Sequence, residues 1–152
     1  MPVAAKGCGL RKGRYSETGG IYLLTAVVQG RRPVFSDWRL GRLLVEQMRA
    51  ADDEGRVKSL AWVVMPDHLH WLIELNQTSL AALMCRVKSR SCRSINLKCG
   101  LHERLWQRGY HDRALRRDED LKTAARYIVM NPLRAGLVQR LGDYPLWDAV
   151  WL

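Results

Sequence analysis

Long apolar runs are absent from this chain of 152 residues. No uninterrupted apolar stretch approaches the roughly 20 residues that a bilayer-spanning helix needs. Residues 1–10 hold no long apolar run either, so the sequence predicts neither a secretory signal nor a membrane partner. We find no internal repeat and no low-complexity segment. We therefore expect a single domain at residues 15–152, preceded by a flexible basic arm at residues 1–14.

Paired cysteines are absent as well. None of the 4 cysteines belongs to a Cys-x-x-Cys pair, which excludes zinc-ribbon and thioredoxin-like sites. Cys85, Cys92 and Cys99 recur every seven residues, a spacing that predicts small core residues on one face of a helix. They cannot pair within a straight helix, because seven residues rise about 10 Å and the Cα atoms of a disulfide lie within about 7 Å. A reduced, cytoplasmic protein is the simplest interpretation.

Acidic residues are scarce relative to basic ones. The chain has 15 Asp and Glu against 25 Lys and Arg, which gives a formal net charge of +10. A small domain this basic favours a polyanionic partner, and nucleic acid is the first candidate. A basic surface kept for solubility and a polybasic membrane-binding surface are the alternatives.

The order of predicted elements indicates an α+β fold. Apolar and β-branched residues at 21–28, 57–65 and 68–75 predict three strands, and residues 110–115 predict a shorter fourth strand. Helical spacing predicts helices from a cap at Ser36 or Asp37 to about 53, from 80 to about 97, and from 118 to about 131, where Pro132 stops the last one. This order favours a ferredoxin-like antiparallel sheet with two helices on one face and the third helix near the other.

Two histidines separated by one residue begin the third predicted strand. His68 and His70 project from one face because strand residues two apart point the same way, while Leu69, Trp71 and Ile73 point into a core with the first two helices. Neighbouring imidazoles on a rigid strand form half of a metal site, although two ordinary surface histidines give the same pattern. The third helix is expected over the face to which these histidines point.

Tyr127 and Asn131 are four residues apart on the predicted third helix and so share one of its faces. Two imidazoles and one amide oxygen make a three-ligand site for a divalent metal, with positions left for a substrate oxygen. A phenol beside such a metal becomes a nucleophile toward a phosphodiester, and the product is a covalent phosphotyrosine. Taken singly, a core tyrosine and a helix-ending asparagine are the ordinary alternatives. Tyr110 is a weaker candidate because no ligand-type residue follows it four positions later.

These motifs resemble those of a known family. His68-Leu69-His70, preceded by Val-Met-Pro-Asp, resembles the HUH motif (histidine, bulky apolar residue, histidine) of single-tyrosine DNA transposases. The segment 127–138 (YIVMNPLRAGLV) is similar to the tyrosine segment of one branch, the REP-associated tyrosine transposases. Residues 106–115 (WQRGYHDRAL) and 19–25 (GGIYLLT) are also similar to that branch, so the resemblance covers roughly residues 15–150.

The resemblance implies a fold, a cofactor and a reaction. It implies a ferredoxin-like fold, with Mg²⁺ or Mn²⁺ bound by His68 and His70 and with Asn131 as the amide ligand. Tyr127 would attack a phosphate of single-stranded DNA and leave a 5′-phosphotyrosine and a free 3′-hydroxyl. The substrate would be the foot of a repetitive extragenic palindromic (REP) hairpin, with a short guanine-rich tetranucleotide read beside it. The protein would be a monomer or homodimer in the cytoplasm, associated with the nucleoid.

Arginines supply the expected contacts with DNA phosphates. Arg86, Arg90 and Arg93 recur on one face of the second predicted helix, where a phosphate track and an ordinary solvated face are equally good interpretations. The complete predicted set is Arg86, Arg90, Arg93, Arg113, Arg116, Arg117 and Arg134. Two alternatives to the tyrosine enzyme are a hairpin-binding protein without turnover and a metal hydrolase that uses water as the nucleophile.

Overall fold

The fold is built on an antiparallel sheet of five strands in the order β4-β1-β3-β2-β5. A computed structural model describes residues 17–116 and 120–151, so the predicted arm at 1–14 and Arg117 lie outside the described residues. The strands are β1 (Ile21–Val27), β2 (Val57–Met65), β3 (His68–Leu75), β4 (His111–Leu115) and β5 (Trp147–Ala149). The first four have the strand order of a ferredoxin-like sheet, and β5 extends it beyond β2.

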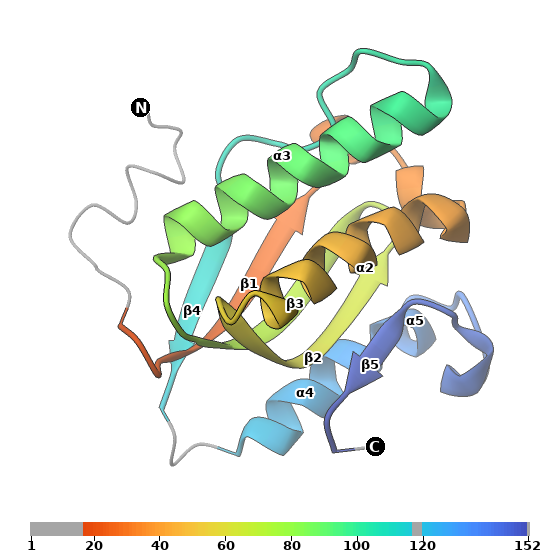
Figure 1. Ribbon diagram of the computed structural model, residues 1–152. Helices are drawn as coiled ribbons and strands as arrows, with labels where there is room; N and C mark the ends of the chain where they lie inside the picture. The colour runs from red at the N-terminus through yellow and green to blue at the C-terminus, as the bar shows by residue number, and fades with distance from the viewer. Residues whose placement is uncertain (1–16, 117–119, 152) are drawn as a thin grey trace.

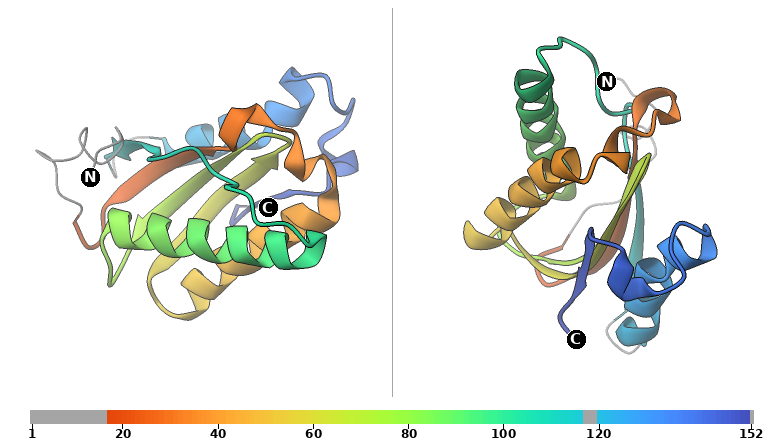
Figure 2. Two further views of the ribbon diagram at one scale, coloured as in Figure 1. Left: turned by 90° about the horizontal axis from the view of Figure 1, so that it is seen from above. Right: turned by 90° about the vertical axis from the view of Figure 1, so that its right-hand side faces the viewer.

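Helices cover both faces of the sheet. Figures 1 and 2 show α2 (Trp38–Asp53) and α3 (Leu80–Cys99) on one face, and α4 (Leu121–Val129) with the short α5 (Asn131–Arg134) on the other. Short 3₁₀ segments are η1 (Gln29–Arg31), η2 (Val34–Ser36) and η3 (Leu141–Asp143). The predicted α+β, ferredoxin-like class is confirmed. Within residues 17–116 and 120–151, no helix is long and apolar enough to cross a membrane.

Side-chain caps fix where the long helices begin. Asp37, Ser79 and Asp120 each precede a helix and accept a hydrogen bond from a first-turn backbone N–H, at 3.0, 3.1 and 3.1 Å. Such caps satisfy donors that have no partner within the helix. Helix α3 ends where Gly100 adopts a left-handed φ of 67°, two residues later than predicted. The predicted strands at 57–65 and 68–75 are confirmed at both ends.

Alternate side chains of β3 contribute to two hydrophobic cores, one on each face of the sheet. Leu69, Trp71 and Ile73 pack in the core that lies against α2 and α3, whereas Leu72 packs with Ile128 on α4 in the opposite core. Trp71 is completely buried, and burial of a large apolar side chain stabilises the folded state by about 1.5–3 kcal/mol. Because its neighbours point to α2 and α3, His70 points to the face that α4 covers, as the sequence predicts.

The region around Asn131 differs from the predicted single helix over 118–131. Helix α4 begins at Leu121 after its cap Asp120 and ends at Val129, and Asn131 starts the separate helix α5. Pro132 does not stop a helix but occupies the first turn of α5, where a missing N–H costs no intrahelical hydrogen bond. The first predicted helical residues, 118 and 119, lie outside the described part of the chain.

The cysteine prediction is wrong in one respect. Cys85, Cys92 and Cys99 are free and share one side of α3, but Cys85 and Cys99 are exposed and Cys92 is only partly buried. The buried side of α3 is set by larger apolar residues, including Leu83 and Val87, and the seven-residue series lies off that stripe. A constant spacing shows that residues share a face but not which face it is.

The C-terminal segment adds a strand that the sequence did not predict. Strand β5 has only three residues, too few for a detectable alternation, and it pairs with β2. The Tyr144 hydroxyl donates to the Val64 carbonyl oxygen at 2.6 Å, and burial raises the pKa of Tyr144 to about 12. Gly41 on α2 lies directly against the buried Leu146 side chain, where a Cβ atom would clash. These contacts fasten the segment after α5 to the β2 side of the sheet.

Candidate active site

The two histidines of β3 form an imidazole pair on the α4 face. Their ring centroids are 4.8 Å apart and their planes meet at 80°. Nδ1 of His68 lies 2.7 Å from Oδ1 of Asp67, and Nδ1 of His70 lies 2.9 Å from Oγ1 of Thr25. With a proton on each Nδ1, both rings donate to these oxygens and present an Nε2 lone pair. This is the arrangement in which histidines bind metals, since partners beyond the metal fix the tautomer and ring orientation.

Electrostatics keep one ring of the pair neutral. Burial, the neighbouring His68 and the charge of Arg134 lower the pKa of His70 to about 4. His70 is therefore uncharged at neutral pH and can bind a metal without first losing a proton. Burial raises the pKa of the Asp67 carboxyl, but hydrogen bonds from His68 and Arg31 outweigh that effect and lower it. Asp67 is thus a carboxylate that accepts from His68.

A chain of contacts holds Asp67 in place. Arg31, at the end of η1, donates to Oδ2 of Asp67 at 3.1 Å, while the backbone N–H of Val28 donates to the Asp67 carbonyl oxygen at 2.9 Å. Arg31 adopts a positive φ of 50°, which is unusual for a residue other than glycine. The side chain and the backbone of Asp67 are therefore both fixed by the segment 28–31.

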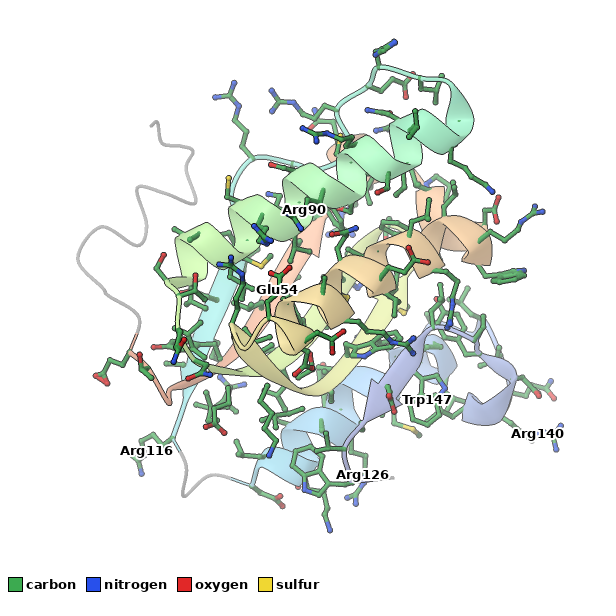
Figure 3. All side chains as sticks on the ribbon, in the orientation of Figure 1. Glu54, Arg90, Arg116, Arg126, Arg140 and Trp147 are labelled. Carbon is green, nitrogen blue, oxygen red and sulfur yellow. The ribbon has the colours of Figure 1, made fainter. Side chains whose placement is uncertain are left out.

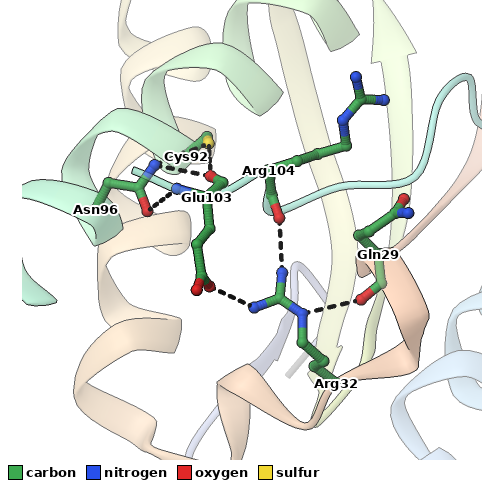
Figure 4. A network of polar contacts seen from close by, with 6 residues as sticks. All are labelled: Gln29, Arg32, Cys92, Asn96, Glu103 and Arg104. Carbon is green, nitrogen blue, oxygen red and sulfur yellow. Dashed lines mark hydrogen bonds and ion pairs between the residues drawn. The ribbon is translucent and has the colours of Figure 1, made fainter. Parts of the chain in front are cut away.

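That segment is itself anchored by a polar network around Arg32 (Figure 4). The Arg32 guanidinium donates to the Gln29 carbonyl oxygen at 3.1 Å, to Oε1 of Glu103 at 3.0 Å and to the Arg104 carbonyl oxygen at 2.6 Å. Asn96 on α3 in turn donates to the Glu103 carbonyl oxygen at 2.9 Å. The network ties η1 to the loop that follows α3, and η1 places Arg31 next to Asp67.

Tyr127 lies on α4 with most of its side chain in solvent. The residue is 64% exposed, so it is not a buried core tyrosine. Ala125, Ile128 and Val129 form the buried side of α4 and hold the helix against the sheet. The guanidinium carbon of Arg134 lies 4.0 Å from the centroid of the Tyr127 ring, within the range of a cation–π contact.

Arg134 joins Tyr127 to Asn131. Its NH2 group donates to Oδ1 of Asn131 and to the carbonyl oxygen of Tyr127. Since its charge also lowers the pKa of His70, the guanidinium lies on the side of the imidazole pair. The structure thus places His68, His70, Tyr127, Asn131 and Arg134 on the same face of the sheet.

The donors on this face fit a divalent cation. Among residues 17–116 and 120–151, no group of three or more His, Cys, Asp and Glu side chains is positioned to hold a metal. A site here would therefore combine the two imidazole nitrogens with an oxygen from another residue type. The amide oxygen of Asn131 is such a donor. Oxygen ligands suit Mg²⁺ and Mn²⁺, whereas imidazole nitrogens suit transition metals, so the mixed set fits Mn²⁺ better than Mg²⁺.

Tyr110, the weaker nucleophile candidate, lies elsewhere. It packs against the core shared with α2 and α3, across the sheet from the imidazole pair, and its hydroxyl is buried. A phosphodiester in solvent would not reach that oxygen without movement of the surrounding core. The geometry therefore favours Tyr127 over Tyr110.

The predicted DNA-binding arginines divide between the two faces. Arg113 on β4 is paired with Leu23 on β1 and, together with Tyr127, lines a cavity of about 300 Å³ beside α4. Arg116 follows β4 (Figure 3). The second group, Arg86, Arg90 and Arg93, lies on α3, across the sheet. Arg86 and Arg90 form ion pairs with Glu54 at the end of α2, at 3.0 and 4.0 Å.

Sequence reasoning missed several residues around the imidazole pair. Thr25 is found only through strand register, because β1 and β3 place it directly opposite His70. Asp67 precedes His68 in the chain, and a carboxylate beside a candidate metal ligand was an available signal. Arg31 carries no such signal, since its approach to Asp67 depends on the turn at η1. Arg126, exposed next to Tyr127 on α4 (Figure 3), adds positive charge that was also overlooked.

The fold and the sequence together place the chain among the IS200-like transposases. The sequence model of that family, described as "Transposase IS200 like", matches residues 18–131, and the chain belongs to this family. More particularly, its relatives include the REP-associated tyrosine transposase of Escherichia coli (strain K12), which is 25% identical over 134 residues and is matched over 87% of this chain and 78% of its own length.

Two further comparisons agree. A candidate REP-associated tyrosine transposase of Haemophilus influenzae is 26% identical over 143 residues, which cover 84% of this chain and 78% of that protein. The solved structure of a REP-associated tyrosine transposase bound to a REP hairpin superimposes with a TM-score of 0.73 at 24% identity and covers 88% of this chain and 79% of that one. The resemblance seen in the sequence is confirmed.

Proposed function

We propose that the protein is a metal-dependent endonuclease and strand transferase for single-stranded DNA, acting at palindromic hairpins through a covalent 5′-phosphotyrosine at Tyr127. The observation that carries this proposal is the exposed Tyr127 phenol on the sheet face of the imidazole pair, connected to it through Arg134. The solved relative bound to a REP hairpin supports the choice of substrate.

We propose His68, His70 and Asn131 as the residues that would hold Mg²⁺ or Mn²⁺. His70 suits this role because it is neutral, and His68 because the Asp67 carboxylate orients its ring. The Asn131 amide oxygen, which Arg134 contacts, is the proposed third donor. Bound there, such a cation withdraws negative charge from the scissile phosphate.

Tyr127 acts as the nucleophile in this proposal. A bond forms between its Oη atom and phosphorus while the bond from phosphorus to the 3′ oxygen breaks. The phenolic proton passes to solvent, and the departing 3′ oxygen takes up a proton to become a hydroxyl. Attack by another 3′-hydroxyl on the phosphotyrosine reverses these bond changes and joins a new strand.

DNA would approach over the α4 face. Arg113 and Arg134 are proposed phosphate contacts near Tyr127, because both lie on that face. Arg116, which directly follows β4, is proposed as a further contact. Arg117 remains a proposed contact from the sequence alone. Arg86, Arg90 and Arg93 are proposed contacts for a more distant part of the hairpin, since α3 lies across the sheet (Figure 1).

These positions predict unequal effects of removing single charges. We expect Arg113→Ala to weaken binding of a hairpin-bearing single strand and to lower the salt-dependence slope by about 0.7. Arg90→Ala should have a smaller effect, because Arg90 lies on α3, across the sheet from Tyr127. Fluorescence anisotropy over a series of salt concentrations measures both slopes. A larger loss for Arg90→Ala would place the DNA on the α3 face and contradict this path.

The support that Asp67 gives His68 yields a second prediction. Asp67→Ala should lower the affinity for Mn²⁺ by about 10- to 100-fold, the usual range for a residue that orients a metal ligand. Asp67→Asn keeps an oxygen acceptor and should lose less. Electron paramagnetic resonance of free Mn²⁺ measures these affinities. Asp148→Ala removes the same charge from an exposed position on β5 and serves as the control. Equal affinities of Asp67→Ala and wild type would remove Asp67 from the site.

The proposed function is tested by trapping the covalent product. Wild-type protein is incubated with Mn²⁺ and 5′- or 3′-labelled single strands that carry hairpins, then denatured and separated by electrophoresis. We expect an adduct with the fragment downstream of the cut and a free upstream fragment ending in a 3′-hydroxyl. Tight hairpin binding with no adduct on any strand would instead support a binding protein without turnover.

A further inference from the structure

Arg134 donates a hydrogen bond to Oδ1 of Asn131, the same oxygen atom that is proposed as a metal ligand. Its guanidinium donates to Oδ1 of Asn131, donates to the carbonyl oxygen of Tyr127, and lies over the Tyr127 ring at 4.0 Å. An amide oxygen that accepts from a cationic guanidinium is a poorer ligand for a second cation. The guanidinium also places a positive charge beside the imidazole pair. This charge would repel a divalent cation bound by His68 and His70.

We propose that Arg134 and the divalent cation compete for the amide oxygen of Asn131, so that metal binding releases Arg134 from Asn131 toward the phosphate attacked by Tyr127. This inference rests on the proposed function, because it takes Asn131 as a metal ligand. It adds a coupling between the binding of the metal and the release of Arg134 from Asn131. Arg134 is held on Asn131 without metal, and it becomes a phosphate contact when the site is loaded.

The position of Arg134 makes such a release geometrically simple. It is the last residue of the four-residue helix α5, and its side chain is exposed. Its side chain therefore moves without disturbing the buried side of α4, which Ala125, Ile128 and Val129 provide. Because the guanidinium already stacks on Tyr127, a short movement keeps it beside the phenol.

Removal of Arg134 should then have opposite effects on metal binding and on DNA cleavage. We expect Arg134→Ala to bind Mn²⁺ about 5- to 10-fold more tightly than wild type, because a competitor for the ligand is gone. We expect the same variant to form the covalent DNA adduct about 100-fold more slowly, because a positive charge beside the phosphate is lost. If Arg134 had only a structural role, its removal would weaken both Mn²⁺ binding and adduct formation.

The experiment measures Mn²⁺ affinity of the DNA-free protein by electron paramagnetic resonance in wild type, Arg134→Ala, Asn131→Ala and the double variant. The gain from Arg134→Ala should fall to less than about 2-fold in the Asn131→Ala background, since the shared oxygen is absent. An equal gain in both backgrounds, or no gain in either, would overturn the proposal. Because no DNA is present, these results are independent of the adduct assay, which decides the proposed function itself.

A measurement on the unmodified protein removes any dependence on variant folding. In a Mg²⁺ titration followed by NMR, the Arg134 Nε–H signal should change along the same curve as the ring signals of His68 and His70. Arg134→Lys identifies the signal by its loss. Saturation of the imidazole signals with an unchanged Arg134 signal would show that the arginine stays on Asn131, and the competition would be excluded.

Discussion

Tyr127→Phe should abolish the covalent adduct with single-stranded DNA and reduce strand cleavage by at least about 10³-fold. The substitution removes one oxygen atom and leaves the aromatic ring under Arg134. Since the residue is 64% exposed, its hydroxyl has little role in the core, and the thermal unfolding midpoint should stay close to that of wild type. Denaturing electrophoresis with labelled hairpin strands measures the adduct and the cleaved fragments.

Tyr110→Phe is the matched control for this prediction. It makes the same chemical change at a tyrosine whose hydroxyl is buried in the opposite core. We expect full adduct formation from this variant. Cleavage by Tyr127→Phe at nearly the wild-type rate would instead point to water as the nucleophile and to a metal hydrolase.

His70→Ala should reduce Mn²⁺ affinity by more than about 100-fold, since loss of a ligand costs more than loss of a residue that supports one. Thr25 holds the His70 ring at its Nδ1 atom, and a pKa of about 4 keeps that ring neutral. His68→Ala should have an effect of the same order. Adduct formation should fall in parallel in both variants, at Mn²⁺ concentrations that saturate the wild type.

His111→Ala provides the control for the imidazole pair. His111 lies on the same sheet but on β4, opposite Thr25 and separated from His70 by β1. This variant should bind Mn²⁺ as wild type does. Retention of wild-type affinity by His70→Ala, or an equal loss in His111→Ala, would show that the metal lies elsewhere.

The sequence predicted the fold well where periodicity is strong. The alternation after Asp67 placed His68 and His70 on one face and Trp71 on the other, because a single register satisfies a strand buried on both sides. Strand β5 escaped prediction because three residues show no period. The split between α4 and α5 escaped it for a different reason. Pro132 is compatible both with a helix end and with a helix start, and only the backbone distinguishes them.

The candidate site was predictable only in part. His68, His70, Tyr127 and Asn131 stand out through their spacing and through the family resemblance. Thr25 and Arg31 do not, because their contacts with His70 and Asp67 join segments that are distant in the sequence. Arg134 and Asn131 are only three residues apart in the sequence. Their contact was still not predicted, because an arginine at this position is equally well interpreted as a DNA contact. Local sequence gives the residue types, whereas strand register and turns decide which of them meet.

Mass spectrometry of the trapped adduct tests the central claim most directly. After nuclease trimming and tryptic digestion, we expect a nucleotide attached through its 5′-phosphate to Tyr127 in the peptide of residues 127–134, which contains no other tyrosine. Attachment to Tyr110 or to any other residue, or a cleaved strand with no protein attached, would show that Tyr127 is not the nucleophile.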